Sequence, residues 1–454
     1  MVSLKLLAVL SSTLAIAHAS LQIVPGGTWT VSDSTHLNAH GAGIIALNGT
    51  YYLIGEDKSQ GSSFLNVNCY SSRDLVRWQY EGALLSRTGS SGDLGPNRII
   101  ERPKVIYNDR TGKFVMWMHV DSSDYKDARV GVAVGDSVCG RYSYIKSFRP
   151  LGFQSRDMGL FKDDDGSAYL LTEDRENGLR INKLTADHLD LSGTSSTYLW
   201  KDHLESPALI KLQGRYYMFG SHLTGWDTND NVYSTSTSLT SGWSSWQTFA
   251  DIGSHTYNSQ TTYILAYGGS AGNVMYMGDR WVSKNLQAST YVWLPLTVSG
   301  GKVTMKNYVS WVPNLDTATA WAGPPEETSY EGEKATYSGG AKDVSCSACS
   351  GGKAAGYVGG DGNGKVTFPG VRSDAGGMTT VRVKYNNGDS KPRFAQVTVN
   401  GGQPVKLAFE PNSGDPASSS LNVELKAGTA NTIVFEGVSG GWGPDIDRLM
   451  VPVR

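Results

Sequence analysis

Short apolar stretches, each opened by a polar residue, recur along the N-terminal two thirds of the chain. In every repeat an apolar strand leads through a glycine turn to a second, aromatic-rich strand that ends in polar residues. The fourth repeat, for example, runs from Glu205 through the apolar run 208–210 and Gly214 to the aromatic run 216–219. Short strands with glycine turns, and no stretches of helical period, predict an all-β protein. The repeats begin at His40, Glu101, Asp157, Glu205 and Gln260.

The spacing of these repeats predicts a five-bladed β-propeller. Successive starts lie 61, 56, 48 and 55 residues apart, which suits one four-stranded blade each. The first strand of every blade lines the central channel of a propeller, so the five starting residues should meet at one mouth. Because each hairpin is antiparallel, the ends of the second strands should surround the same pocket. These ends are Glu56, Asp57, His119, Glu173, His222, Asp279 and Arg280.

The pattern changes after about Thr304. Residues 317–328 are rich in Thr, Ala, Pro and Glu and are interpreted as a linker. Residues 329–454 alternate short strands with Gly, Asn and Asp turns, which predicts a β-sandwich (jelly-roll) domain. The expected plan is therefore a signal peptide at 1–19, a propeller at 20–316, the linker, and a sandwich at 329–454.

The N-terminus has the features of a secretory signal. Lys5 precedes an apolar run, and Ala17-His18-Ala19 forms a small-x-small cleavage site. We therefore expect a secreted, extracellular protein, with no membrane span further along the chain. The net charge of −2 gives no electrostatic basis for binding nucleic acid or an anionic membrane, and we expect a monomer. The 12 Trp and 23 Tyr suit sugar stacking as well as core packing.

Four cysteines in an oxidising compartment permit three pairings. We expect the pairs Cys69–Cys139 and Cys346–Cys349, because each then stays inside one domain. A redox or zinc role for Cys346-x-x-Cys349 is the alternative, although no second Cys/His pair accompanies it. The only glycosylation sequon, at Asn48, should be exposed in a hairpin turn.

Three carboxylates, Glu101, Asp157 and Glu205, are predicted to share the channel mouth. Like charges in a desolvated funnel should raise at least one pKa. Such a set suits glycoside hydrolysis, in which a carboxylic acid protonates the leaving oxygen and another group handles water. A calcium site that includes His40 is the alternative.

The motifs Ser155-Arg156-Asp157 and Leu204-Glu205-Ser206-Pro207, set in the repeat pattern, resemble glycoside hydrolase family 43. That resemblance implies a five-bladed propeller that hydrolyses plant polysaccharides with inversion. It also implies that Asp157 adjusts the pKa of the acid and that Glu205 is the general acid. Where most members carry the base in an Asp-Pro pair, this chain has Ala39-His40-Gly41.

That gap, together with the segments 55–59, 101–104 and 277–281, resembles the fungal exo-β-1,3-galactanase branch of the family. The resemblance implies that Glu101 holds the hydroxyl next to the anomeric carbon and that Gln260 places the attacking water. A neutral amide is a poor base, so Gln260 would orient water through its carbonyl or act through an imidic-acid tautomer. No cofactor is expected for the chemistry.

Other sugar contacts are expected from position in the repeat or from the resemblance, with packing or an ordinary rim hydrogen bond as the alternative for each. Arg280 and Trp281 are expected to brace the site. The candidate contacts are Glu56, Arg102, Tyr125, Asn177, Trp226 and Asp279.

The C-terminal domain resembles carbohydrate-binding module family 35 in Tyr330-Glu331-Gly332-Glu333, in 350–357, in Asn387-Gly388-Asp389 and in 444–448. The resemblance implies a structural Ca²⁺ held by Glu331, Glu333 and Asp447. Turn chemistry is the alternative for the acidic residues in Asn-Gly and Gly-Asp pairs. The sugar-binding candidates are Tyr357, Asn387, Asp389, Arg393 and Asp445.

Together these features lead us to expect a secreted, inverting hydrolase that releases galactose from β-1,3-galactan, the backbone of arabinogalactan. The sandwich would hold the enzyme on its polysaccharide and raise the local substrate concentration. An α-L-arabinofuranosidase or a β-xylosidase is the enzymatic alternative. A non-catalytic galactan-binding lectin is the alternative from another class, because the usual base is missing.

Overall fold

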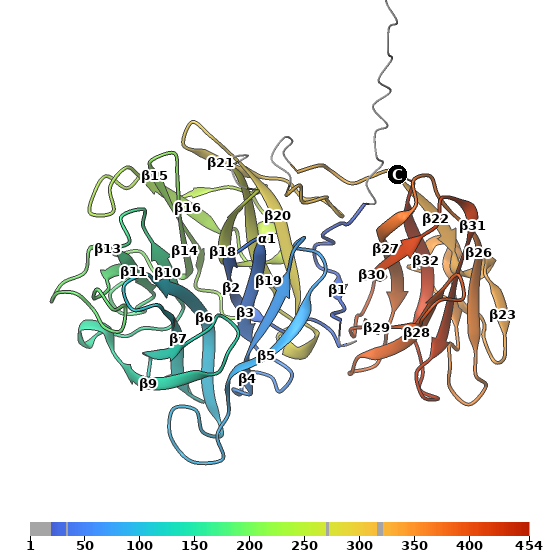
Figure 1. Ribbon diagram of the computed structural model, residues 1–454, viewed down its shortest axis with the longest axis horizontal. Helices are drawn as coiled ribbons and strands as arrows, with labels where there is room; N and C mark the ends of the chain where they lie inside the picture. Colours follow the sequence, from blue (N-terminus) through green and yellow to red (C-terminus); the bar gives the residue numbers. More distant parts are fainter. Residues whose placement is uncertain (1–19, 33–34, 269–271, 316–320, 454) are drawn as a thin grey trace, which may run out of the picture.

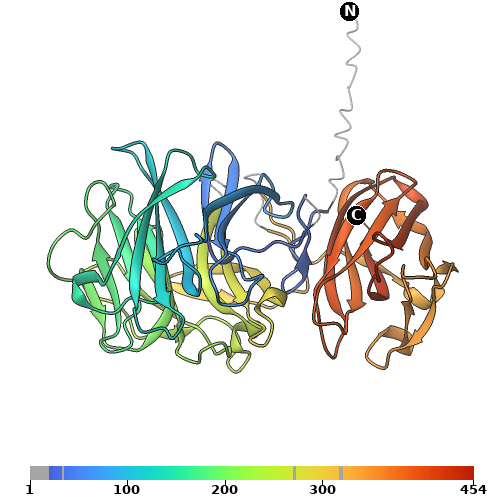
Figure 2. The ribbon, with the colours of Figure 1, turned by 90° about the horizontal axis from the view of Figure 1, so that it is seen from below.

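The computed structural model describes residues 20–32, 35–268, 272–315 and 321–453. A ring of sheets forms the larger part of the molecule, and a two-sheet domain lies to one side of it (Figure 1, Figure 2). The predicted signal peptide lies outside the described residues. In the described part of the chain, no helix has the length and apolar character needed to cross a bilayer.

Five four-stranded antiparallel sheets follow one another along the chain, one for each sequence repeat. The first consists of β2 (His40–Leu47), β3 (Thr50–Glu56), β4 (Asn66–Ser72) and β5 (Gln79–Ser86). The second consists of β6 (Arg98–Asn108), β7 (Lys113–Ser122), β8 (Arg129–Gly135) and β9 (Tyr142–Phe148). The third consists of β10 (Met158–Lys162), β11 (Ala168–Thr172), β12 (Leu179–Lys183) and β13 (Tyr198–Trp200). The fourth consists of β14 (Leu204–Leu212), β15 (Arg215–His222), β16 (Val232–Ser236) and β17 (Gln247–Thr248). The fifth consists of β18 (Gln260–Tyr267), β19 (Asn273–Arg280), β20 (Thr290–Ser299) and β21 (Lys302–Met305).

The first strands of these sheets surround the ring axis. Each contacts the first strand of the next sheet, and β18 contacts β2, so the ring is closed in the manner of a β-propeller. Asn48 and Gly49, which join β2 to β3, both have positive φ, as a two-residue hairpin turn of type I′ requires. The sequon at Asn48 is therefore exposed, as predicted.

Packing between the sheets is dominated by aromatic side chains. Trp29, Trp78, Trp293 and Trp311 lie in one buried cluster, where the indoles of Trp29 and Trp293 meet edge to face at 4.9 Å. Short helical turns lie between strands, at η1 (Pro150–Gly152), α1 (His255–Asn258) and η3 (Leu286–Ala288).

The C-terminal domain packs two sheets face to face over a core that includes Phe368, Tyr385, Phe409 and Phe435. One sheet contains β22 (Glu327–Glu331), β24 (Lys342–Ser345), β25 (Lys353–Gly356), β27 (Gly377–Asn386), β30 (Ala417–Leu425) and β32 (Asp445–Pro452). The other contains β23 (Thr336–Ser338), β26 (Lys365–Ser373), β28 (Arg393–Val399), β29 (Val405–Phe409) and β31 (Gly428–Gly437). Two further turns are η4 (Gly332–Lys334) and η5 (Ser350–Gly352).

Both predicted disulfides are present, one in each domain. Cys69 on β4 is joined to Cys139 in the β8–β9 loop, and Cys346 is joined to Cys349. The first links the first two propeller sheets, and the second closes a loop of the sandwich.

The start of the described chain belongs to both domains, which the predicted boundaries missed. Strand β1 (Thr28–Trp29) pairs in parallel with β30 at the edge of the sandwich sheet. The Thr28 hydroxyl lies 3.0 Å from the Tyr385 hydroxyl in the sandwich, whereas Trp29 stacks on Tyr291 of the propeller at 5.2 Å. Alternate side chains of one strand thus fasten the two domains together. At the other boundary β22 already begins at Glu327, inside the predicted linker.

Candidate active site

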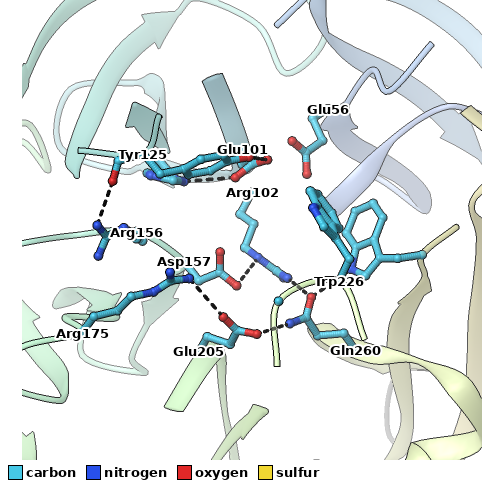
Figure 3. A pocket seen from close by; sticks show the side chains of 13 residues that line it. Glu56, Glu101, Arg102, Tyr125, Arg156, Asp157, Arg175, Glu205, Trp226 and Gln260 are labelled. Atoms are coloured by element: carbon cyan, nitrogen blue, oxygen red, sulfur yellow. Dashed lines mark hydrogen bonds and ion pairs between the residues drawn. The ribbon is translucent and has the colours of Figure 1, made fainter. Parts of the chain in front are cut away.

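A cavity of about 240 Å³ opens at one mouth of the ring axis (Figure 3). It brings together eight of the predicted site residues, namely Glu56, Glu101, Arg102, Tyr125, Asp157, Glu205, Trp226 and Gln260. Four side chains that were not among the predicted catalytic or sugar-binding residues complete the wall, namely His119, Arg156, Arg175 and Trp281.

β-Bulges at the channel end of the first strands aim these side chains. The register shifts after Glu101 in β6 and after Glu205 in β14, and the next residues, Arg102 and Ser206, have φ of +52° and +58°. A bulge places two residues opposite one and turns the strand. Glu101 and Arg102 can therefore both face the cavity although they are adjacent.

Glu205 is held as a neutral carboxyl group. It is 4% exposed, and burial, followed by the negative charges of Asp157 and Glu173, raises its pKa to about 9. Its Oε1 accepts a hydrogen bond of 2.8 Å from Gln260 Nε2, and its Oε2 lies 3.6 Å from Arg175 Nη2. A carboxyl group that keeps its proton at neutral pH can serve as a general acid.

Asp157 lies beside Glu205 and accepts hydrogen bonds from two side chains. Its Oδ2 accepts from Arg102 Nε at 2.7 Å and from Ser206 Oγ at 2.7 Å. Carboxylate oxygens of Asp157, Glu173 and Glu205 all lie within 4.8 Å of one another. This crowding, relieved at Asp157 by Arg102, keeps the proton on Glu205.

Glu101 is the opposite case, a carboxylate fixed as an anion. Its oxygens contact Lys58 Nζ at 2.9 Å, Tyr125 Oη at 3.0 Å and His119 Nδ1 at 3.3 Å. Burial alone would raise the pKa of Glu101, but Lys58 and His119 outweigh it and lower that pKa well below the ordinary range. An anion held in this way is a strong acceptor for a sugar hydroxyl.

The same lysine holds Glu56 on the opposite side of the cavity from Glu205 (Figure 3). Lys58 Nζ lies 2.9 Å from Glu56 Oε2, and the lysine side chain is only 1% exposed. Burial raises the pKa of Glu56 to about 7, against the opposing effect of Lys58. Lys58 stands within the 55–59 motif, yet the repeat did not single it out, because it lies beyond the strand end.

Gln260 uses every hydrogen-bonding position of its amide. Its Oε1 accepts from Arg102 Nη2 at 2.6 Å and from Trp281 Nε1 at 2.9 Å, and its Nε2 donates to Glu205 and, at 3.1 Å, to Ser221 Oγ. Arg102 and Trp281 can only donate, so the amide orientation follows from its neighbours. Gln260 therefore links the acid, the cavity arginine and the aromatic wall.

The turn before Gln260, α1, has an unusual backbone conformation. The four residues of α1 all have φ between +52° and +60°, a left-handed conformation that is costly for L-residues. Arg280 satisfies two carbonyls of this turn, through Nη2 to Tyr257 O at 2.9 Å and Nε to Asn258 O at 3.1 Å. The expected bracing role of Arg280 matches these contacts.

Seven residues predicted around this pocket do not line the cavity, namely His40, Asp57, Glu173, Asn177, His222, Asp279 and Arg280. His40 is fully buried, with Nδ1 3.1 Å from Asp279 Oδ1, and Asp279 Oδ2 accepts from Gly41 N at 3.1 Å. Asn177 is exposed in the β11–β12 turn, where its amide donates to Asp174 at 2.9 Å. The structure thus places Asp279 behind the cavity and Asn177 in turn chemistry rather than in the predicted position for sugar contact.

The sandwich presents a second group of candidate residues around two half-exposed rings. Tyr357 and Trp442, each 45% exposed, meet edge to face at 6.0 Å, and Lys342 Nζ lies 4.4 Å from the centre of the tyrosine ring. The sequence prediction did not include Trp442, because it stands alone in a glycine-rich loop. A tryptophan among glycines, where no apolar pattern predicts burial, was the sequence signal that could have identified it.

The other sugar-binding candidates of the sandwich differ in their surroundings. Arg393 donates to Asp389 Oδ2 at 2.7 Å and to the carbonyl of Gly443, the residue after Trp442, at 3.0 Å. Asp445 is partly buried, which raises its pKa. Asn387 is fully buried, and its amide donates to Lys391 O and Phe409 O. Asn387 therefore shapes the loop and is not placed to touch a ligand.

The predicted calcium ligands carry oxygens with few protein partners. Oε2 of Glu331 and Oε2 of Glu333 are buried without a hydrogen bond among the described residues. Asp447 is 1% exposed and accepts from Ser350 N at 2.9 Å. Buried carboxylate oxygens without donors fit a cation site.

A buried carboxyl group with a raised pKa beside further carboxyl groups, in a cavity with aromatic walls, is the arrangement of a glycoside hydrolase. The chain belongs to this class through its family: the model for glycosyl hydrolases family 43 matches residues 38–269. A second model, described as the CBM13 domain of alpha-galactosidase, matches residues 365–451. The C-terminal domain is therefore a CBM13-like carbohydrate-binding module, and the predicted assignment to family 35 goes beyond this match.

Solved structures of this family resemble the chain over most of its length. An exo-β-1,3-galactanase from Phanerochaete chrysosporium, solved with galactose, is 37% identical over 95% of this chain and 100% of its own, with a TM-score of 0.67. A putative exo-β-1,3-galactanase from Bifidobacterium bifidum is 35% identical over 64% of this chain and 97% of its own, with a TM-score of 0.60. An exo-β-1,3-galactanase from Clostridium thermocellum is 26% identical over 94% of this chain and 99% of its own, with a TM-score of 0.63.

A curated relative is described as a xylosidase and not as a galactanase. It is a xylan 1,3-β-xylosidase from a Vibrio species, 27% identical over 196 residues, which are 38% of this chain. The match spans only 34% of that enzyme's length.

Proposed function

We propose that the protein is a secreted galactan 1,3-β-galactosidase that releases galactose from the chain ends of β-1,3-galactan with inversion. The observation that carries the proposal is the pairing of a protonated Glu205 with the 37% identity to an exo-β-1,3-galactanase over 95% of the chain. A variant of that enzyme has been solved with β-1,3-galactotriose. Secretion rests on the N-terminal signal sequence.

In this mechanism Glu205 gives its proton to the glycosidic oxygen as the bond to the anomeric carbon breaks. The resulting carboxylate is stabilised by Arg175 at 3.6 Å and by the Gln260 amide at 2.8 Å. Asp157 raises the pKa of Glu205 through its negative charge, and its Oδ2 is held by Arg102 Nε at 2.7 Å. Water attacks the opposite face of the sugar and passes its proton to solvent.

Glu101 binds the hydroxyl next to the anomeric carbon. Its anionic oxygens, fixed by Lys58, Tyr125 and His119, are ready acceptors, and a hydrogen bond there strengthens as positive charge develops on the sugar ring. Trp226 and Trp281, which meet edge to face at 5.0 Å, supply apolar wall for the sugar face.

Gln260 places the attacking water by exchanging one of its present bonds. Both acceptor positions of Oε1 are occupied, by Arg102 and Trp281. Substrate entry that draws the Trp281 indole away frees one lone pair for water. The amide then orients the water, while the fixed Arg102 keeps Oε1 facing the cavity.

The C-terminal domain holds the enzyme on its substrate, in the manner of carbohydrate-binding module family 35. Tyr357 and Trp442 provide the stacking surface, and Arg393, Asp389 and Asp445 provide polar contacts. A Ca²⁺ bound by Glu331, Glu333 and Asp447 would fix the start of the domain to its last strand, because β22 and β32 pair directly. The donor-poor oxygens of Glu331 and Glu333 support this assignment.

The direct test is sugar release from β-1,3-galactan, arabinan and β-1,3-xylan by the purified protein, with Glu205→Gln as the control. Galactose from galactan alone, and none with the variant, is the expected result. Release of xylose from β-1,3-xylan would instead favour the specificity named for the Vibrio relative. Binding to galactan without any product over long incubation would identify a lectin.

A further inference from the structure

A second cavity, of about 500 Å³, lies between the first propeller sheet and the C-terminal domain. We call it the interdomain groove. The propeller supplies Asn38, Asp57, Tyr80 and Gln287 to its wall, and the C-terminal domain supplies Lys391 and Phe394. Its volume is within the range of roughly 300–1,000 Å³ that ligand sites occupy.

The groove and the catalytic cavity share one wall, the segment that follows β3. Glu56 lines the catalytic cavity, Asp57 lines the groove, and Ser59 lines the groove again. Lys58, between them, is the buried cation that holds Glu56 and Glu101. Side chains of this segment therefore face both cavities, which lie on its two sides.

The polar floor of the groove is held in place before any ligand arrives. Asp57 accepts from Asn38 Nδ2 at 3.1 Å, from Ser59 N at 2.8 Å and from Asn68 Nδ2 at 3.3 Å. Asn38 Oδ1 in turn accepts from Lys58 N at 2.9 Å. A fixed floor lowers the entropy lost when a ligand binds.

The two domains that form the walls are also fastened to each other. Asn285 Nδ2 donates to Ser390 O at 3.0 Å, directly before Lys391. His36, at the groove edge, lies 3.0 Å from Glu410 of the sandwich. With β1 paired to β30, these contacts keep the groove open at a fixed width.

The lining has the chemistry of a site for a neutral sugar chain. The half-buried rings of Tyr80 and Phe394 supply apolar surface, with Lys406 Nζ over the Phe394 ring at 4.2 Å and Tyr70 beside Tyr80 at 5.2 Å, and the carboxylate of Asp57 can accept from hydroxyl groups. Among the described residues, no partner is found for the side-chain amide of Gln287 or the ammonium of Lys391. One free polar group therefore faces the groove from each domain.

The groove also lies next to the candidate sugar site of the C-terminal domain. Both belong to the loop that joins β27 to β28: Lys391 faces the groove, whereas Arg393 contacts Asp389 and Gly443 near Trp442. We propose that the interdomain groove binds galactose units of the same β-1,3-galactan chain whose end occupies the catalytic cavity. The proposal rests on the proposed function and adds a binding site that joins the two domains.

The test measures affinity as a function of chain length in protein made inactive by Glu205→Gln. Calorimetry with β-1,3-galacto-oligosaccharides, from the disaccharide to long chains, should show tighter binding once a chain is long enough to reach the groove. Adding Gln287→Ala and Lys391→Ala should weaken binding of the long chains about tenfold, a loss of about 1.4 kcal/mol, and leave the disaccharide unaffected. Lys284→Ala, at an exposed site nearby, is the matched control.

Equal length dependence in the double variant and its parent would overturn the proposal. A length effect that survives in the double variant and vanishes with Trp442→Ala would also overturn it, by assigning the effect to the module's own site. Thermal melting confirms that each variant is folded. If the wild-type protein releases no galactose from β-1,3-galactan, the proposed function fails, whereas galactose release with unchanged long-chain binding removes the groove alone.

Discussion

The propeller and the sandwich each contain a group of carboxylates with buried oxygens, and the two groups are paired differently. In the propeller, Glu101 faces Lys58 and His119, and Asp157 faces Arg102. In the sandwich, the nearest cation to Asp447 is Arg448 at 3.8 Å, and Glu331 and Glu333 each keep a buried oxygen without a hydrogen bond. Fixed cations of the protein therefore neutralise carboxylates of the propeller group, whereas two oxygens of the sandwich group have no hydrogen-bond donor.

This difference separates proton chemistry from cation binding. Where fixed cations neutralise some carboxylates of a group, the remaining one, Glu205, can hold a proton at neutral pH. Where carboxylate oxygens are left without donors, as in Glu331 and Glu333, they suit an external cation, which is the basis of the proposed Ca²⁺ site. The predictions below alter one group at a time, and their effects should fall on turnover in the propeller and on stability in the sandwich.

The largest effect is expected from Glu205→Gln. Loss of the proton donor should lower kcat on galactan by about 10³-fold, within the range of general acid catalysis. An aryl β-galactoside with a good leaving group needs little protonation, so its hydrolysis should fall much less. Kinetics on both substrates check this, and equal losses on the two would contradict the role of general acid.

Gln260→Ala should lower kcat by about 10²-fold, because the water loses its orienting group. Ser221→Ala is the matched control, since it removes a partner of Gln260 Nε2 and leaves the carbonyl in place. Its kcat should stay within about tenfold of wild type. Near-full turnover by Gln260→Ala would remove the water-placing role.

Asp157→Asn should move the alkaline limb of the pH–activity profile. Glu205 acts in its protonated form, so activity is lost as pH rises through its pKa of about 9. Burial is the main cause of that raised pKa, and the Asp157 charge is the next. Removing the charge should lower the pKa of Glu205, so that the alkaline limb moves to lower pH by about one unit. A profile of kcat/KM checks this, and an unchanged or raised limb would contradict it.

The smallest effect on turnover is expected in the sandwich. Chelation of Ca²⁺ should lower the Tm by several degrees, because a bound ion at a hundredfold excess over its Kd adds about 2.7 kcal/mol to the free energy of unfolding. Glu333→Gln should abolish this response, while kcat on a soluble trisaccharide stays unchanged. Calorimetric melting with and without chelator checks this, and a response equal to wild type would contradict the assignment of Glu333.

Much of the propeller could be predicted from the sequence because its repeat is regular. Strand starts and ends follow from alternating polar and apolar positions, which identified Glu101, Asp157, Glu205 and Gln260. Side-chain direction could not be predicted in the same way. A bulge turns Arg102 into the cavity, and the same kind of irregularity after His40 leaves that ring buried against Asp279.

Functional residues outside the repeat were harder to predict from the sequence. Lys58 lies beyond a strand end, and Trp442 stands alone among glycines, so neither has a periodic signal. Asn177 forms a turn contact with Asp174 outside the cavity lining, and such an Asx turn looks like a sugar contact in sequence. Strand β1 contains two residues, too short for any pattern to reveal, and its partner is far along the chain.

The pairing of Thr28 with Ser419 has a consequence for how the protein is made. During synthesis the N-terminal strand emerges first, yet the sheet edge that receives it is completed only near the end of the chain. Until then the polar edge of β1 has no partner, since contacts distant in sequence form slowly, whereas the indole of Trp29 can already pack on Tyr291 and Trp293 of the propeller. A propeller cut free of its module would keep that edge open, so the two domains are best regarded as one folding unit.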